Sequence, residues 1–279
     1  MLAKRVVTAA VLLAILLPAI FAAPDWAWGL VSLVFLAVAA HEWARLLPPP
    51  TRERRAAAVV VAVGLAALAW RARAPWPEHA LVAACLALTA FWALLGPNRL
   101  ARHAAHRGGW PLGAALLLGC WIALYELRVI GPLALVSSMA VVWVADIGAY
   151  FVGRAIGRRK LAPSISPGKS WEGAIGGALS VLVLGFAFAA APWSAGAPWL
   201  AASLPSTLAA SLPPALAALA LVALVALSIV GDLHESLLKR RAHVKDSGAI
   251  LPGHGGVLDR IDALVPAMPA ALLLYLMLG

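Results

Sequence analysis

The segment from Ser236 to Asp262 carries the side chains of this sequence that are best suited to chemistry. It reads SLLKRRAHVKDSGAILPGHGGVLDRID and holds five Lys or Arg, three Asp, two His and four Gly between two long apolar runs. Carboxylates are hard oxygen ligands of the kind that Mg²⁺ takes beside phosphates. Ammonium and guanidinium groups bind phosphate oxygens. The segment therefore predicts a site for a metal ion and phosphate groups.

A second polar group begins just before this segment, at the end of the preceding apolar run. Four of its side chains fall at i, i+4, i+7 and i+8 and so share one helical face: Asp232, Ser236, Lys239 and Arg240. One carboxylate, one hydroxyl and two cations on a face could hold a metal ion and a phosphate. The alternative is a solvated helix end at a membrane interface, where long charged side chains reach for water.

A glycine-rich turn and two further carboxylates follow. Lys245 and Asp246 lead into Leu251–Gly256, where glycines let backbone amides approach a ligand closely. An ordinary tight loop is the alternative. Asp259 and Asp262 are three residues apart on the first turn of the last apolar run, where the helix dipole favours carboxylates. Together with the upstream carboxylate, they favour a metal–phosphate site.

The histidines predict no zinc site, because the sequence has no HExxH motif and no cysteine partner near them. His254, between glycines, is interpreted either as a phosphate hydrogen-bond donor or as a structural residue. The two cysteines, Cys85 and Cys120, lie inside apolar runs and are expected to be buried small hydrophobes.

A third polar group lies upstream. Asp146 falls inside an apolar run, where an acidic residue is a functional candidate by default and a structural partner of an Arg otherwise. In the loop that follows, Ser166 precedes a Gly-Lys-Ser sequence that resembles the end of a P-loop. The first glycine of that motif would fall at Pro163, and no preceding strand is expected. Ser170 as a helix N-cap beside Lys169 still predicts a phosphate site.

Composition indicates the kind of protein that positions these groups. The chain has 279 residues, of which 63% are hydrophobic and 12% charged, and several apolar runs exceed the ~18 residues that a spanning helix needs. The runs are continuous and do not alternate as barrel strands would. We therefore expect an all-α, polytopic transmembrane helical bundle. The net charge of +10 is attributed to lipid headgroups and loop topology, and no nucleic-acid partner is expected.

The bundle should have about nine spans, within a range of eight to ten. All Lys and Arg except Arg71, Arg73 and Arg128 fall on one side if the N-terminus is cytoplasmic, as the positive-inside rule requires. The expected apolar segments are 6–23, 26–47, 56–70, 79–96, 111–127, 129–153, 171–192, 207–230 and 261–279.

The first segment has the length of a signal peptide and follows Lys4 and Arg5. Cleavage would fall after Phe-Ala-Ala at 21–23, which lacks a small first residue and precedes Pro24. We therefore expect a retained span. The whole chain, 1–279, is expected to be one integral membrane domain.

Its catalytic part is expected at about 140–279, and its N-terminal spans at about 1–127. Gly173 and Gly177, with Gly176, suit close helix packing and would allow a homodimer.

These residues resemble a known signature. The pattern S-x-L-K-R-x4-K-D-x-G-x2-L-P-x-H-G-G-V-x-D-R-I-D over 236–262 is similar to that of phosphatidate cytidylyltransferases, also called CDP-diacylglycerol synthases. The stretch 146–177 is similar to a second region of that family, and His41-Glu42-Trp43 fits it more loosely. Gly168 stands where a polar residue is usual, Ser170 where Thr is frequent, and His234 where an aromatic residue is common.

The resemblance implies transfer of CMP from CTP to phosphatidic acid, which gives CDP-diacylglycerol and pyrophosphate. The implied setting is a bacterial-type inner membrane, with the active site facing the cytoplasm. The implied cofactor is Mg²⁺, with room for a second cation. Asp232 and Asp259 are the first choices for metal ligands, and the further candidates are Asp246, Asp262 and Asp146.

The other implied roles concern the substrates. The groups expected to bind phosphates at the reacting centre are Ser236, Lys239, Arg240, Lys245 and Arg260. Those expected to contact nucleotide or lipid phosphate are Ser166, Lys169 and Ser170. Those expected to shape the CTP pocket are His254, Gly255 and Gly256.

Two alternatives belong to other classes. A CTP-dependent polyprenol or phytol kinase resembles this family in architecture but would transfer the γ-phosphate to an alcohol. A transporter with a charged intramembrane site would show solute flux without CTP turnover. Paired discontinuous helices in two related halves would favour the transporter, and the sequence shows none.

Overall fold

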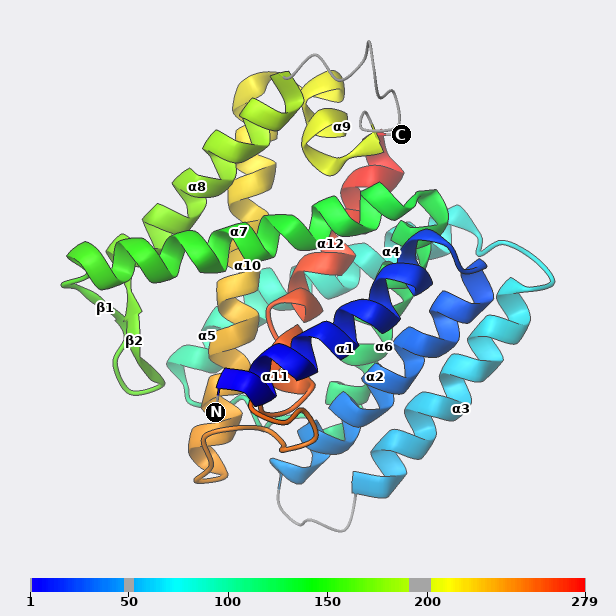
Figure 1. Ribbon diagram of the computed structural model, residues 1–279, viewed down its shortest axis with the longest axis horizontal. Coiled ribbons are helices and arrows are strands. Elements are labelled where there is room, and N and C mark those ends of the chain that lie inside the picture. Colours follow the sequence, from blue (N-terminus) through cyan, green and yellow to red (C-terminus); the bar gives the residue numbers. More distant parts are fainter. Residues whose placement is uncertain (1, 48–52, 191–201, 279) are drawn as a thin grey trace.

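A computed structural model describes residues 2–47, 53–190 and 202–278, which fold mainly into helices (Figure 1). The first half comprises α1 (Leu2–Phe21), α2 (Asp25–Arg45), α3 (Glu53–Arg71), α4 (Glu78–Ala90), the π-helix η2 (Phe91–Leu95), α5 (Gly96–Ala101) and α6 (Gly109–Ile130). The second half comprises α7 (Pro132–Ile156), β1 (Lys160–Ala162), β2 (Ser166–Ser170), α8 (Trp171–Ala190), α9 (Leu204–Ser211), α10 (Pro214–Arg241), α11 (Leu258–Ile261) and α12 (Leu264–Leu278).

The expected helical membrane architecture is confirmed. Within the described ranges, seven helical stretches are long and apolar enough to cross a bilayer, with α4 to α5 forming one stretch and α11 to α12 another. The two expected segments outside this set are also helical: α1, whose apolar part Val6–Phe21 is shorter, and α3. The count of nine spans and the cytoplasmic N-terminus remain predictions.

One expected segment is divided. The apolar run 207–230 was predicted as a single helix, but α9 ends at Ser211 and α10 begins at Pro214. Leu212 between them is extended (φ −128°, ψ 149°), because a residue that precedes proline is driven out of the helical region. The proline pair at 213–214 therefore ends one helix and starts the next.

A small antiparallel hairpin replaces the loop expected before α8. Lys160 in β1 pairs with Ser170 in β2, and Ala162 pairs with Ser166. The expectation that no strand precedes the Gly-Lys-Ser sequence was therefore wrong. The P-loop assignment still fails, because Pro163 keeps the place of its first glycine.

Glycines bring α7 and α8 into close contact next to this hairpin. A Cβ atom on Gly173 would lie 2.8 Å from the Ala149 carbonyl oxygen, and one on Gly177 would lie 2.5 Å from that of Ala145. The expected packing role of these glycines is confirmed. Their small faces are occupied by α7 of the same chain.

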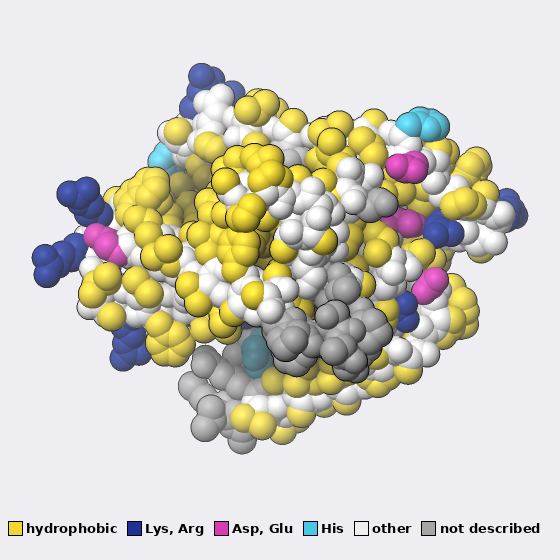
Figure 2. Space-filling view, turned by 90° about the horizontal axis from the view of Figure 1, so that it is seen from above, with side chains coloured by type: hydrophobic (Ala, Val, Ile, Leu, Met, Phe, Trp, Pro, Cys, Tyr) yellow, Lys and Arg dark blue, Asp and Glu magenta, His cyan; other side chains and the backbone are white. Residues whose placement is uncertain are grey.

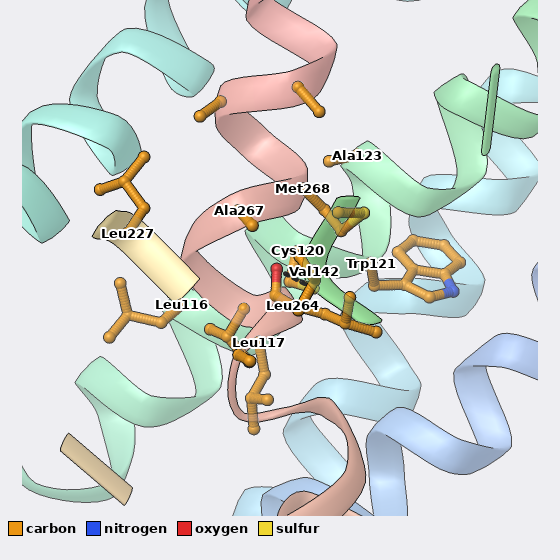
Figure 3. Packing of buried hydrophobic residues seen from close by; sticks show 14 of the residues in the cluster. Leu116, Leu117, Cys120, Trp121, Ala123, Val142, Leu227, Leu264, Ala267 and Met268 are labelled. Carbon is orange, nitrogen blue, oxygen red and sulfur yellow. Dashed lines mark hydrogen bonds between the residues drawn. The ribbon is translucent and has the colours of Figure 1, made fainter. Parts of the chain in front are cut away.

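The core is apolar and continuous between α6 and α12 (Figure 3). Cys120 lies in its centre and donates from Sγ to the Leu264 carbonyl at 3.6 Å. Cys85 is buried as well, and both described cysteines are free thiols, as expected. Hydrophobic side chains are spread widely over the face shown in Figure 2, and many large ones are exposed, which suits contact with lipid chains.

Two ion pairs mark one end of the bundle, where α2 begins and where α3 and α6 end. Arg71 Nε lies 2.9 Å from Glu126 Oε1, and Arg128 Nη1 lies 3.3 Å from Asp25 Oδ1. Both arginines are among the three that the predicted orientation places outside the cytoplasm. Carboxylates at that end therefore balance them.

Candidate active site

A cavity of about 460 Å³ opens between α7, α8, α10 and the hairpin. Five of the predicted site residues line it together: Asp146, Ser166, Lys169, Ser170 and Asp232. They come from three segments that are well separated in the sequence. The fold thus joins the upstream polar group to the end of α10.

Asp232 contacts two other polar side chains of the predicted site. The Lys169 ammonium forms an ion pair with its Oδ2, and Ser236 donates from Oγ to its Oδ1 at 3.2 Å. The Lys169 and Asp232 side chains remain 26% and 27% exposed, so a ligand can reach them. The shared helical face predicted for Asp232 and Ser236 is therefore present.

Two other carboxylates surround this pair. Asp232 interacts electrostatically with both Asp146 and Asp262, and Lys169 interacts with the same two residues. Asp262 Oδ1 accepts the Ala263 backbone N–H at 2.8 Å. Asp146 and Asp232 line the cavity together with Lys169, whereas Asp262 is not among the lining residues and also interacts with Lys239.

Asp259 lies elsewhere and has other partners. Its oxygens accept the Lys239 ammonium at 2.6 Å, the Ser247 N–H at 3.0 Å and the Gly256 N–H at 2.8 Å. Lys239 also pairs with Glu235 across one helical turn. Asp259 is not among the residues that line the cavity. It holds the glycine-rich turn against α10.

The remaining predicted cations use part of their hydrogen-bonding capacity on backbone oxygens. Arg240 Nε donates to the Ile165 carbonyl at 3.2 Å and so ties α10 to the hairpin. Arg260 donates from Nη2 to the His254 carbonyl at 2.6 Å. Lys245 and Asp246 are exposed on the connection after α10. None of these side chains lines the cavity.

The predicted CTP-pocket residues surround Asp259. Gly255 has a positive φ of 83°, and a Cβ there would lie 2.8 Å from Asp259 Oδ2. His254 Nδ1 is buried without a hydrogen-bond partner among the described residues. The structure places His254, Gly255 and Gly256 outside the cavity lining. Their role toward CTP stays a prediction.

One prediction about local structure can be checked directly, and the packing of His234 can be compared with its place in the sequence pattern. Ser170 Oγ accepts the Gly173 N–H at 3.1 Å, so it is the N-cap of α8 as expected. His234 is fully buried, stacked on Trp43 at 5.5 Å and edge-on to Trp92 at 5.2 Å between ring centroids. It therefore packs as an aromatic ring would, which fits its place in the sequence pattern.

Sequence reasoning missed Glu42 as a site residue. It lies inside an apolar segment, as Asp146 does, so the rule that flagged one acidic residue would have flagged the other. Glu42 is buried and accepts hydrogen bonds from Ser247 Oγ at 3.2 Å and from the Leu258 N–H at 2.8 Å. The N-terminal part of the chain thus contacts the glycine-rich turn directly.

The donor set fits a hard divalent cation that is completed by its substrate. Within residues 2–47, 53–190 and 202–278, no three His, Cys, Asp or Glu side chains form a complete metal-binding group. Mg²⁺ is usually held by one or two carboxylates together with water and substrate phosphates. Asp232 and Asp146, which line one cavity, would be the two carboxylates of such a site.

Comparison with known proteins agrees with this chemistry. The sequence matches the model of the Cytidylyltransferase family over residues 3–278. A Pseudomonas aeruginosa protein named phosphatidate cytidylyltransferase is 40% identical over 286 residues, which cover 98% of this chain and 97% of that protein. Proteins of the same name from Haemophilus influenzae and Bacillus subtilis are 45% and 41% identical over 139 and 160 residues. Those matches cover 50% and 56% of this chain, and 44% and 54% of the two relatives.

Proposed function

The chain belongs to the cytidylyltransferase family, and from this premise we propose that it makes CDP-diacylglycerol from CTP and phosphatidic acid. Similarity along nearly the whole length to a phosphatidate cytidylyltransferase supports the reaction. The observation that carries the location is the pairing of Lys169 with Asp232 inside a cavity. It brings a phosphate-binding cation and a metal-binding carboxylate to one place.

In this reaction, a phosphate oxygen of phosphatidic acid attacks the α-phosphorus of CTP. The bond from that phosphorus to the bridging oxygen of the leaving pyrophosphate breaks, and CMP stays on the lipid phosphate. Both reactants are polyanions, so the main demand is positive charge and alignment. Lys169 in the cavity meets part of this demand.

Asp232 and Asp146 would hold Mg²⁺, with Asp262 beside them. When bound, Mg²⁺ would neutralise charge on the reacting phosphates. Lys169, which pairs with Asp232 in the structure, is then free to turn toward a phosphate. We propose that Asp259 organises the glycine-rich turn. Metal binding by Asp246, which is exposed nearby, and binding of a second cation stay predictions.

The setting is an integral membrane protein, as its long apolar helices show. The bacterial relatives support a bacterial inner membrane. A cavity that faces the cytoplasm, where CTP is made, follows from the proposed orientation. A homodimer gains no support from the small faces of Gly173 and Gly177, because they pack within the chain.

The test uses detergent-purified protein with phosphatidic acid, Mg²⁺ and CTP labelled at the α-phosphate. Label should enter a lipid product, and unlabelled pyrophosphate should be released. Label that enters lipid only from γ-labelled CTP would identify a kinase instead. Solute flux in proteoliposomes with no CTP consumption would identify a transporter, and either result would overturn the proposal.

A further inference from the structure

We infer that Glu42 is the positioning residue that fixes the glycine loop, defined here as Ser247–Leu258, for the cytidylyl transfer proposed above. The inference rests on that function. Glu42 lies near the end of α2 and is only 1% exposed. It is far in sequence from every residue that lines the cavity.

One carboxylate oxygen of Glu42 holds both ends of the loop. Oε2 accepts the Ser247 hydroxyl at 3.2 Å and the Leu258 N–H at 2.8 Å. These partners are 205 and 216 positions away in the chain. A buried carboxylate with two donors fixes geometry more firmly than neutral groups do, since charge-assisted hydrogen bonds are stronger.

The loop sequence is adapted to this carboxylate. A Cβ atom on Gly248 would collide with Glu42 Oε1. One on Gly256 would collide with Ser247 Oγ and would lie 2.6 Å from Glu42 Oε2. Neither glycine has a positive φ. The space for Glu42 and for the Ser247 hydroxyl that bonds to it, and not backbone conformation, is therefore what these two positions need. At Gly248, the absence of a side chain is explained by a residue outside the loop.

Glu42 is connected to charged groups of α10 through this loop. Ser247, which bonds to Glu42 through its hydroxyl, donates its N–H to Asp259. Asp259 accepts the Lys239 ammonium, and Lys239 lies two turns after Asp232 on α10. Losing Glu42 should therefore displace Asp259 and Lys239 without removing any group that touches substrate.

The unused oxygen of Glu42 suggests a conservative variant. Oε1 has no hydrogen-bond partner in the part of the chain that the structure describes. In Glu42→Gln, the amide oxygen can take the place of Oε2 and keep both bonds, and the NH₂ group occupies the place of Oε1. Glu42→Leu keeps bulk and loses both bonds.

The experiment compares kcat and KM for CTP, per folded protein, in detergent. Glu42→Leu should lose about 100-fold in kcat, the scale of a small misplacement of reacting groups, and Glu42→Gln should retain most activity. The matched control is Glu126→Leu, which removes another buried carboxylate, near the end of α6 and paired with Arg71. It should lower the thermal midpoint and leave kcat unchanged.

A kcat for Glu42→Leu within twofold of the unmodified protein would overturn the inference. Equal losses in Glu42→Leu and Glu42→Gln would also overturn it, because the hydrogen bonds would not be the cause. If Glu42→Leu does not fold, Gly248→Ala tests the same contact. The loss of kcat that Gly248→Ala causes should be smaller in a Glu42→Asp background, because the shorter side chain leaves room for the added methyl group. Failure of the unmodified protein to form CDP-diacylglycerol would instead reject the proposed function.

Discussion

An ion pair between Lys239 and Asp259, with 2.6 Å between Nζ and Oδ1, connects α10 to α11. Lys239 also pairs with Glu235, so that one ammonium serves two carboxylates. The side chain of Lys239 is 14% exposed, that of Asp259 is 5% exposed and that of Glu235 is 2% exposed. A single cation thus serves two buried carboxyl groups beside the glycine loop.

Lys239→Met should destabilise the protein by about 3–5 kcal/mol, because removing one member of a buried ionic group leaves uncompensated charge. The measurement is thermal or denaturant unfolding in detergent. Lys239→Met/Glu235→Gln should be more stable than Lys239→Met alone, since one of the two carboxyl groups that Lys239 served is gone. A double variant as unstable as the single one would show that Glu235 does not depend on Lys239.

Asp232→Asn should raise the Mg²⁺ concentration needed for half-maximal activity by about 10- to 100-fold, the usual range for weakened metal sites. The measurement is a Mg²⁺ titration of CDP-diacylglycerol formation. Asp259→Asn is the comparison and should lower kcat and stability with an unchanged Mg²⁺ midpoint. A raised Mg²⁺ midpoint for Asp259→Asn with an unchanged midpoint for Asp232→Asn would instead identify Asp259 as the metal ligand.

Gly177→Ala should lower stability by about 1–3 kcal/mol, as overpacking of a tight contact does. The added methyl would meet the Ala145 carbonyl at 2.5 Å and push α7 from α8. Gly168→Ala, whose Cβ would meet nothing within 4 Å, is the control for stability. Equal thermal midpoints for both variants would contradict the close contact.

The predicted orientation can be tested with single cysteines. Ser164→Cys, on the exposed turn of the hairpin, should resist a membrane-impermeant maleimide in intact cells and react in inverted vesicles. Ala74→Cys, exposed between α3 and α4, should behave in the opposite way. Cys85 and Cys120 are buried and should give little background. Labelling of both variants from the same side would refute the orientation.

Hydropathy and residue spacing were sufficient to predict the helices and part of the site. The i, i+4 spacing placed Asp232 with Ser236, and the cap pattern placed Ser170 at the start of α8. Both are local relationships that follow from helical geometry. The packing role of Gly177 follows in the same way from a small residue in a membrane helix.

The contacts between distant segments could not be predicted in this way. Nothing near Asp259 in the sequence shows that Lys239 and two backbone amides occupy its oxygens. Likewise, nothing near Gly248 shows that Glu42 fills the space above it. Such partners are set by how helices pack, and one sequence contains no direct record of that packing.

The bonds from Glu42 to Ser247 and Leu258 also bear on how the protein is made. During synthesis, α2 is completed long before residues 247 and 258 leave the ribosome, since these bonds span 205 and 216 positions. Until then, the carboxylate lacks the donors that stabilise it. An incompletely inserted chain should therefore have no ordered glycine loop. The enzyme would become active only after residues 247 and 258 have packed against α2.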